Sequence, residues 1–292
     1  MSLRLHLNEN TGGCSPAVLA AIRAIDPLDA SVYPDYAGVT GACERWFQVP
    51  AGWVQLTNGL DDGLHVVAQH ARTGRALIVE PAFDMYEICA TGAGLGLTPV
   101  LWEPGAPFPT EAIIAALSPD TRLVYLTDPN NPTGLPIPAG AVARIAEAAP
   151  QTMVLLDEAY AEFSGRTLIG PALDRHRNLV IGRTFAKAHG LAALRAGALI
   201  AHPDALAPLR RLLPPFGVNI CAVRALEAAL GDRPFLDRYV AQSAESRKLL
   251  YVFCEQRGLR YWKSDANFVL IDVGPDATAI VAALARRGIL IR

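Results

Sequence analysis

The stretch from residue 179 to residue 201, LVIGRTFAKAHGLAALRAGALIA, decides the fold prediction. Its two ends, Leu179–Gly182 and Ala198–Ala201, are short apolar runs that predict buried strands. A single lysine, Lys187, lies between them in a connection rich in alanine and glycine. A lysine after a strand is usually a solvated surface charge. If this one is buried, it loses hydration, its pKa falls, and its amine becomes nucleophilic towards an aldehyde.

Similar apolar runs precede this stretch, and amphipathic helical segments separate most of them. The earlier strands are predicted at Val54–Thr57, Ala76–Val79, Pro99–Trp102, Leu123–Thr127 and Met153–Leu156. The helices are predicted at Ser15–Ile25, Val39–Phe47, Leu60–Arg72, Phe83–Ala93, Thr110–Leu117 and Ala139–Ala148. Continuous apolar strands that alternate with helices predict an α/β fold whose mainly parallel sheet is covered on both faces. We expect this large domain to occupy residues 12–215, after an N-terminal segment at 1–11.

The pattern changes after Pro214-Pro215. Two long helical stretches are followed by a strand, a helix and a strand, predicted at Cys221–Leu230, Phe235–Arg257, Asn267–Val273, Thr278–Arg287 and Gly288–Arg292. This order predicts a smaller C-terminal α/β domain over residues 216–292. A cleft between two domains is a common place for a small-molecule ligand.

Composition excludes several classes of protein. The chain has 292 residues, 51% of them hydrophobic, and a net charge of −2, with no basic run that would indicate nucleic acid or a membrane surface. The N-terminus lacks the apolar run of a signal peptide, and no stretch is long and apolar enough for a transmembrane helix. The five scattered cysteines form no C-x-x-C pair, which favours reduced thiols in the cytoplasm over disulfides or a metal site.

Parallel sheets bind ligands beyond the carboxyl ends of their strands, so polar residues there are the first candidates for function. Asp157 ends the apolar run Met153–Leu156 and opens the motif Asp157-Glu-Ala-Tyr160. One interpretation is a helix cap or a structural ion pair. The other is an anion facing a protonated pyridine nitrogen, an attraction of about 4 kcal/mol at ~4 Å that keeps the ring an electron sink.

Two further clusters follow predicted strands. The motif Asp128-Pro-Asn-Asn-Pro-Thr-Gly134 is typical of a turn, but its two prolines would also hold the Asn131 amide rigidly at a strand end. The motif Asn58-Gly-Leu-Asp-Asp62 places a glycine before a helix start, whose free N–H groups can bind an anion, although many helices begin this way. Thr184 and Arg195 bracket the lysine with a hydroxyl and a permanent cation, a pair that suits a phosphate dianion.

Together and in this order, these clusters resemble the pyridoxal-phosphate (PLP) dependent class I/II aminotransferases of fold type I, and among them most closely the histidinol-phosphate aminotransferases. The ordered set is more specific for a PLP enzyme than for one substrate. The matching motifs are Leu7-Asn-Glu-Asn10, Tyr33-Pro34, Asn58-Gly59, Pro81-Ala-Phe83, Asn130-Asn-Pro-Thr-Gly134, Asp157-Glu-Ala-Tyr160, Arg183-Thr-Phe-Ala-Lys187, Arg195, Asn267-Phe268 and Gly288-Ile-Leu-Ile-Arg292.

The resemblance implies a role for each matching residue near the cofactor ring. Lys187 would carry PLP as a Schiff base and move the proton between the substrate carbon and the cofactor carbon. Asp157 would pair with the pyridine nitrogen. Asn131 and Tyr160 would hydrogen-bond the phenolic oxygen of the ring, and Phe83 would stack on the ring face.

The same resemblance implies which residues would bind the cofactor phosphate and the substrate. The phosphate would be held by two side chains and two backbone amides, those of Thr184, Arg195, Leu60 and Asp61. Tyr33 would reach the cofactor phosphate of the neighbouring subunit, which implies a homodimer with shared active sites. Arg292, together with Asn131, would face the substrate.

The implied activity is transamination between histidinol phosphate and 2-oxoglutarate in histidine biosynthesis. An aromatic or other amino-acid aminotransferase, or a phospho-amino-acid decarboxylase, is an alternative on the same scaffold. The chain departs from the family at Ala186 (usually serine) and Phe216 (usually tyrosine), and it ends at Arg292, where the family continues to a second arginine. The C-terminal domain is therefore expected to be truncated, and a PLP-binding remnant without efficient turnover is a third alternative.

Overall fold

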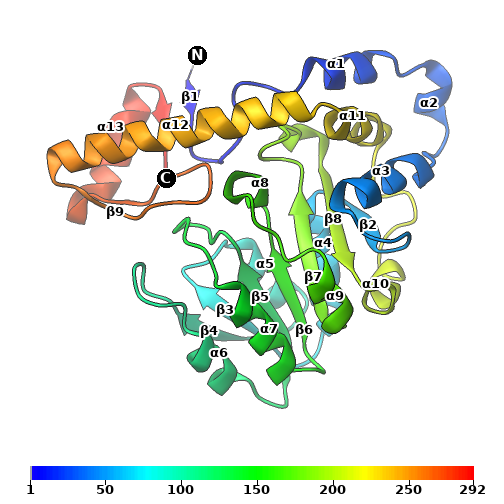
Figure 1. Cartoon of the computed structure of the whole chain (residues 1–292), viewed down its shortest axis with the longest axis horizontal. Helices are drawn as coiled ribbons and strands as arrows, with labels where there is room; N and C mark the ends of the chain where they lie inside the picture. Colours follow the sequence, from blue (N-terminus) through cyan, green and yellow to red (C-terminus); the bar gives the residue numbers. More distant parts are fainter. Residues whose placement is uncertain (1) are drawn as a thin grey trace.

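The computed structural model describes residues 2–292, so Met1 of the predicted N-terminal segment lies outside the described residues. A seven-stranded sheet with the order β2-β8-β7-β6-β5-β3-β4 forms the centre of the molecule (Figure 1). All seven strands lie within a few residues of the predicted runs. They are β2 (Val54–Asn58), β3 (Arg75–Glu80), β4 (Gly96–Leu101), β5 (Thr121–Thr127), β6 (Met153–Asp157), β7 (Leu179–Thr184) and β8 (Ala196–Ala201).

The sheet is parallel except at β8, which pairs antiparallel with both β2 and β7. The connection from β7 to β8 spans only residues 185–195. A parallel neighbour needs a crossover of about a dozen or more residues, usually with a helix, so the chain turns straight back. The loop that carries Lys187 therefore stays at the edge where the parallel strands end.

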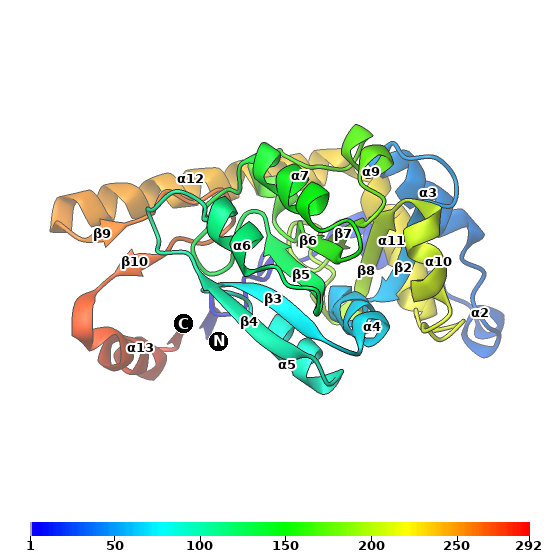
Figure 2. The same ribbon diagram turned by 90° about the horizontal axis from the view of Figure 1, so that it is seen from below.

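Side chains alternate between the two faces of the sheet, as the period of a strand requires. Along β5, Val124 and Leu126 join one core, while Leu123 and Tyr125 join the other. The first face is covered by α1 (Pro16–Arg23), α3 (Ala37–Phe47), α6 (Thr110–Ala116), α7 (Ala139–Ala148), α9 (Pro171–Arg175) and α11 (Ile220–Gly231). The second is covered by α4 (Leu60–Ala71), α5 (Met85–Gly92) and α10 (Pro203–Arg210). Figure 2 shows α6 and α7 above the sheet and α4 and α5 below it.

Four helices were not predicted from the sequence: α2 (Pro27–Ser31), α8 (Ala161–Ser164), α9 and α10. Each has eight residues or fewer, a length at which the helical period is a weak signal, although α1, α5 and α6 are as short and were predicted. The long helix α12 (Arg233–Arg257) begins beside α11 and leads away from the sheet to the last part of the chain (Figure 1). The buried residues of α11 belong to the same core as the sheet, and the proposed domain boundary at residues 215–216 stays a prediction.

The C-terminal part contains less regular structure than the sequence predicted. Strands were expected over Asn267–Val273 and Gly288–Arg292, but only β10 (Ile271–Asp272) and β11 (Ile289–Leu290) form. β10 pairs antiparallel with β9 (Arg260–Tyr261), and β11 pairs parallel with β1 (Leu3–Arg4). These predictions were wrong in extent because apolar composition alone does not supply a neighbouring strand, and an isolated two-stranded ladder is marginal.

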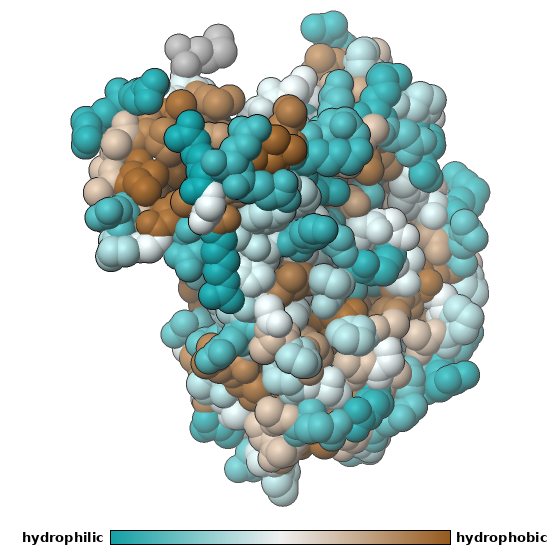
Figure 3. All heavy atoms as spheres, turned by 60° about the vertical axis from the view of Figure 1, so that its left-hand side comes forward, coloured by the Kyte–Doolittle hydropathy of each residue, from teal (hydrophilic) through white to brown (hydrophobic). Residues whose placement is uncertain are grey.

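The terminal unit, defined here as β1, α13 (Ala277–Arg286) and β11, is thinly packed. None of the residues of α13 is buried, and Leu3 of β1 is about half exposed. Figure 3 shows hydrophobic side chains gathered on the upper lobe of the molecule. Among the described residues, no helix combines the length and the apolar character needed to span a membrane.

Candidate active site

The candidate active site forms where β5, β6 and β7 end. Because the three strands are parallel and in register, their carboxyl ends meet at one edge of the sheet. The β5–β6 register sets Thr127 opposite Asp157, and the β6–β7 register sets Asp157 opposite Gly182. Thr184 ends β7, and Asn131 lies in the loop after β5. The sheet therefore brings together residues that are more than fifty positions apart in sequence.

The β7–β8 connection is a compact loop that holds Lys187 at this edge. The amide of Phe185 donates to the carbonyl of Ala196 at 3.1 Å, and the amide of Leu191 donates back to Phe185 at 3.0 Å. The amide of Gly190 donates to the Lys187 carbonyl at 3.1 Å. These bonds fix the backbone on both sides of the lysine.

The Lys187 amine is partly buried and donates a hydrogen bond to the carbonyl of Leu7 at 2.9 Å. Burial lowers the pKa of this amine, and the positive charge of Arg292 lowers it further. The carboxylates of Asp157, Asp61 and Glu9 oppose these effects. A lysine with a lowered pKa is a better nucleophile near neutral pH.

Asp157 is only 3% exposed. Its carboxylate accepts hydrogen bonds from the Tyr86 hydroxyl at 2.8 Å and from the Ala159 amide at 2.9 Å, two neutral donors. Burial raises the pKa of Asp157 to about 6, and the negative charge of Asp61 adds to this, while the two hydrogen bonds and Lys187 act in the opposite direction. A buried carboxylate with neutral donors gains from a cation brought to it, and a protonated pyridine nitrogen is such a cation.

Sequence reasoning missed Tyr86. This fully buried residue bridges Asp157 and Thr127 through its hydroxyl, with 2.7 Å to the Thr127 oxygen. Its ring stacks on Tyr125 at 4.8 Å and meets Phe83 edge-on at 5.9 Å. Phe83 was singled out, and in the predicted helix Phe83–Ala93 Tyr86 would lie three positions further along on the same face, although α5 begins only at Met85. That spacing could have marked Tyr86 as a neighbour of Phe83, but not its contact with Asp157.

Tyr160 and Asn131 meet at the same edge. The Tyr160 ring is buried, and its hydroxyl oxygen receives hydrogen bonds from the Asn131 amide at 3.4 Å and from the Asn8 amide at 3.1 Å. Burial raises the pKa of this hydroxyl to about 12, Asp157 raises it further, and the Asn8 hydrogen bond and the charge of Arg292 lower it. The phenol is therefore a neutral hydrogen-bonding group at physiological pH.

The first turn of α4 and the side chain of Arg195 meet at a corner of the site, which we call the anion corner. Gly59 precedes the helix with φ +76°, a conformation that glycine adopts without strain. A Cβ at Gly59 would strike the guanidinium of Arg195, and a Cβ at Gly197 would strike the backbone nitrogen of Leu60. Gly59 therefore needs glycine for its left-handed backbone, and Gly197 needs glycine because the backbone of Gly59 and Leu60 passes close to it. The guanidinium lies against the start of α4, whose first N–H groups have no acceptor within the helix, and such donors suit an anion.

Arg195 already has partners in this corner. It donates to the Asp61 carboxylate at 2.7 Å and to the Ala192 carbonyl at 3.1 Å. Thr184, on the neighbouring strand end, accepts from the amide of Ala186 at 3.2 Å and keeps its hydroxyl proton available. The sequence named the amide of Asp61 as a candidate but did not predict that its carboxylate pairs with Arg195.

Two of the predicted site residues lie at the margins. Arg292 is exposed, but its charge acts on both Lys187 and Tyr160, so it lies near them. Tyr33 is 75% exposed and stacks on Phe216 with 4.1 Å between ring centroids. Among the described residues it forms no hydrogen bond with the other predicted site residues, so the structure does not bring Tyr33 into the cluster within one chain.

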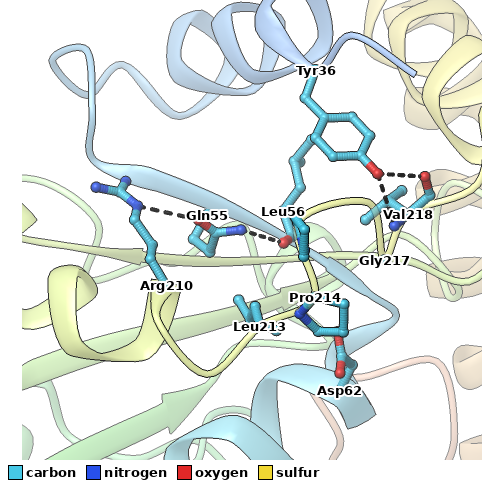
Figure 4. A pocket seen from close by; sticks show the side chains of 10 residues that line it. Tyr36, Gln55, Leu56, Asp62, Arg210, Leu213, Pro214, Gly217 and Val218 are labelled. Atoms are coloured by element: carbon cyan, nitrogen blue, oxygen red, sulfur yellow. Dashed lines mark hydrogen bonds between the residues drawn. The ribbon is translucent and has the colours of Figure 1, made fainter. Parts of the chain in front are cut away.

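A separate pocket of about 230 Å³ lies between β2, α10 and the segment after α10 (Figure 4). Its polar groups are bonded to the protein itself. Tyr36 donates to the Val218 carbonyl at 2.7 Å, and Arg210 donates to Gln55 at 3.1 Å. Asp62 lines it, but none of the predicted site residues does. It therefore offers no convergent polar groups to a ligand and carries no functional assignment.

The fold and the lysine-centred cluster define a class of protein. A mainly parallel α/β sheet with one antiparallel strand presents a buried carboxylate, a lysine of lowered pKa and an anion-binding corner at one edge. This combination fits an α/β enzyme that binds a cofactor with a protonated ring nitrogen, an aldehyde and a phosphate.

Comparison with known proteins gives the family. Residues 2–292 match the family described as aminotransferase class I and II, and the chain belongs to it. A histidinol-phosphate aminotransferase 2 of Ralstonia nicotianae is 39% identical, over 99% of this chain and 80% of its own length. A histidinol-phosphate aminotransferase of Symbiobacterium thermophilum is 36% identical, over 99% of this chain and 81% of its own length.

Solved structures agree with this assignment. Histidinol-phosphate aminotransferase of Sinorhizobium meliloti, in complex with pyridoxal-5'-phosphate, superposes with a TM-score of 0.90 at 30% identity, covering all of this chain and 82% of that one. L-threonine-O-3-phosphate decarboxylase of Porphyromonas gingivalis superposes with a TM-score of 0.83 at 22% identity, covering 99% of this chain and 89% of that one. At this identity the likeness shows the fold alone. The predicted fold, enzyme class and PLP cofactor are thereby confirmed, while the roles of individual residues stay predictions.

Proposed function

We propose that this aminotransferase moves the amino group of histidinol phosphate to 2-oxoglutarate and that Lys187 holds its PLP covalently. The observation that carries the proposal is that one sheet edge brings a partly buried lysine and the buried carboxylate of Asp157 close enough for the charge of each to shift the pKa of the other. The substrate assignment is supported by relatives named as histidinol-phosphate aminotransferases at 31–39% identity over nearly the whole chain.

The chain contains three lysines, and only one suits the cofactor. Lys248 is on the surface of α12 and pairs with Glu245, and Lys263 is exposed. Lys187 alone lies at the strand ends, where burial lowers its pKa. When bound there, PLP supplies an electron sink for the carbon that carries the substrate amine.

Asp157 would keep a proton on the pyridine nitrogen. Its carboxylate is buried and already oriented by Tyr86 and by the Ala159 amide, so it would face the ring without reorganisation. Above a pH of about 6 it is anionic even without the ring, and a facing cation would extend this range to lower pH. Phe83, half-buried and edge-on to Tyr86, would lie against the ring face.

The phosphate would bind in the corner made by Thr184, Arg195 and the amides of Leu60 and Asp61. Each charge-assisted hydrogen bond there would contribute about 1.5–3 kcal/mol. The guanidinium has donors to spare, so it can keep its bond to the Asp61 carboxylate while it binds an anion. Asn131 and Tyr160 would hydrogen-bond the phenolic oxygen of the ring.

Lys187 would then act a second time, as the base. With its amine free, Lys187 Nζ would accept the proton from the substrate carbon that carries the amino group and would later give that proton up. Its lowered pKa leaves a larger fraction of the amine unprotonated at neutral pH, which general-base catalysis requires. Arg292, whose charge reaches Lys187, would bind the anionic group of the substrate together with Asn131.

We further propose a cytoplasmic homodimer. The five cysteines are unpaired, which fits a reducing compartment. Tyr33 and Phe216 form an exposed aromatic pair away from the site of their own chain, and a partner subunit would bring Tyr33 to its cofactor phosphate.

The visible absorption of the purified protein with PLP tests this proposal. We expect a band in the wild type and in Lys248→Ala, an exposed-lysine control, but not in Lys187→Ala. Histidinol phosphate should bleach the band, and 2-oxoglutarate should restore it. A band that other amino donors bleach and histidinol phosphate leaves unchanged would contradict the substrate assignment. Release of CO₂ from a phospho-amino acid would instead support a decarboxylase.

A further inference from the structure

The N-terminal segment of residues 5–10 crosses the candidate site. It leaves the β1–β11 ladder with the Leu5 amide donating to the Leu290 carbonyl at 2.8 Å. It then passes the lysine, where the Leu7 carbonyl accepts from Lys187, and ends with Asn10, whose amide reaches the Ala188 carbonyl at 3.5 Å. The segment is thus held by the terminal unit at one end and by the lysine loop at the other.

Asn8 is the point of this segment that reaches Tyr160. Its backbone has φ +54°, a left-handed conformation that asparagine tolerates better than most residues. Its carbonyl accepts a hydrogen bond from the Asn267 amide at 3.1 Å, and its own side-chain amide donates to the Tyr160 hydroxyl at 3.1 Å. Phe268, next to Asn267, packs edge-on against the Tyr160 ring at 5.1 Å.

These contacts decide in which direction the Tyr160 hydroxyl donates. A phenol has one proton to donate and lone pairs that accept. The amides of Asn8 and Asn131 both donate to this oxygen, from 3.1 Å and 3.4 Å. With its oxygen accepting from both sides, the hydroxyl proton is free to point to a third group. An anionic ring oxygen in the site is a suitable acceptor for it.

We propose that Asn8 is a positioning residue that makes Tyr160 a hydrogen-bond donor towards the cofactor and links that donor to the C-terminal part through Asn267. This inference rests on the proposed function, because it takes the acceptor to be the phenolic oxygen of PLP. A hydrogen bond donated to that oxygen stabilises its anionic form. It therefore favours loss of the proton on the nitrogen that joins PLP to Lys187. Asn8 therefore lowers the pH at which the bound cofactor changes colour.

The test is a pH titration of the visible absorption of the PLP-loaded protein. Asn8→Gly removes the side-chain amide but keeps the left-handed backbone accessible. We expect it to raise the pH midpoint of the colour change by about one unit. Asn8→Asp keeps the size of the side chain and replaces the donor by an acceptor with a negative charge. We expect it to raise the midpoint further, by up to about two units.

A double-mutant cycle separates positioning through Tyr160 from a general structural effect. In a Tyr160→Phe background, Asn8→Gly should leave the midpoint unchanged. An equal shift in both backgrounds, or no shift in the wild-type background, would overturn the inference. If Asn8→Gly does not fold, Asn8→Asp decides alone, because an unchanged midpoint in that variant also overturns it. A different result would contradict the proposed function itself, namely the absence of any Lys187-dependent absorption band in the unsubstituted protein.

Discussion

The carboxyl edge of the sheet and the terminal unit contribute to the same site but are built very differently. At the sheet edge, every residue of β7 and the last four of β6 are buried, and Asp157 is oriented by two hydrogen bonds. In the terminal unit, α13 has no buried residue and β11 pairs with β1 over two residues. The groups proposed to hold the cofactor are thus fixed by a core, whereas Arg292 is attached to a unit that can move at small cost.

The comparison predicts that substitutions at the sheet edge cost most. Asp157→Asn removes the charge facing the ring nitrogen and keeps the shape of the side chain. An attraction of about 4 kcal/mol is lost, so kcat/KM should fall about a thousandfold. Steady-state kinetics would measure this, with Asp174→Asn, on the exposed surface of α9, as the control. A fall of less than about tenfold would contradict the role of Asp157.

The same substitution should increase the stability of the cofactor-free protein, although it lowers activity. Burial raises the pKa of Asp157 from 3.8 to about 6, so the carboxylate destabilises the fold increasingly as pH rises from about 4 to 6. Asp157→Asn should therefore raise the free energy of unfolding by about 3 kcal/mol at pH 7.5, and by less at pH 4.5. Urea unfolding at the two pH values would measure it. Equal stability of the two proteins at pH 7.5 would show that burial of the charge costs nothing.

Arg195→Ala tests the anion corner. Loss of one charge-assisted interaction of about 1.5–3 kcal/mol should weaken PLP binding about ten- to a hundredfold. The freed Asp61 carboxylate would then repel the phosphate and add to the effect. Equilibrium titration with PLP measures the change, and Arg211→Ala, on the exposed end of α10, should leave the affinity unchanged.

The smallest effect is expected in the terminal unit. Arg292→Ala should raise KM for histidinol phosphate about tenfold, the loss of one exposed charge-assisted bond. PLP affinity should not change, because the arginine is not placed against the cofactor phosphate. The exposed Arg287→Ala is the matched control. Weaker PLP binding with an unchanged KM would mean that the terminal unit supports the cofactor and not the substrate.

The contrast between the two regions also explains what the sequence could predict. Strands such as β6 and β7 are apolar along their length, since both faces are buried, and parallel topology then places their ends together. The positions of Asp157, Thr184 and Lys187 followed from that rule. The C-terminal strands were overestimated because their apolar residues lack a sheet to join.

Two contacts that shape the site were beyond sequence reasoning. Tyr86 reaches Asp157 from a helix 71 positions away, and Asn8 reaches Tyr160 across 152 positions. Neither residue type nor local spacing shows which distant side chain will meet a given hydroxyl or carboxylate. Such contacts are set by how the elements pack, which becomes visible only in three dimensions.

The most direct test of the account is to find the residue that carries the cofactor. Borohydride reduction of the PLP-loaded protein makes the bond between PLP and a lysine permanent, and mass spectrometry of its peptides locates the label. We predict the label on Lys187 in the wild type and no label in Lys187→Ala. A label on Lys248 or Lys263, or a protein that binds PLP without any reducible bond to lysine, would contradict the central claim.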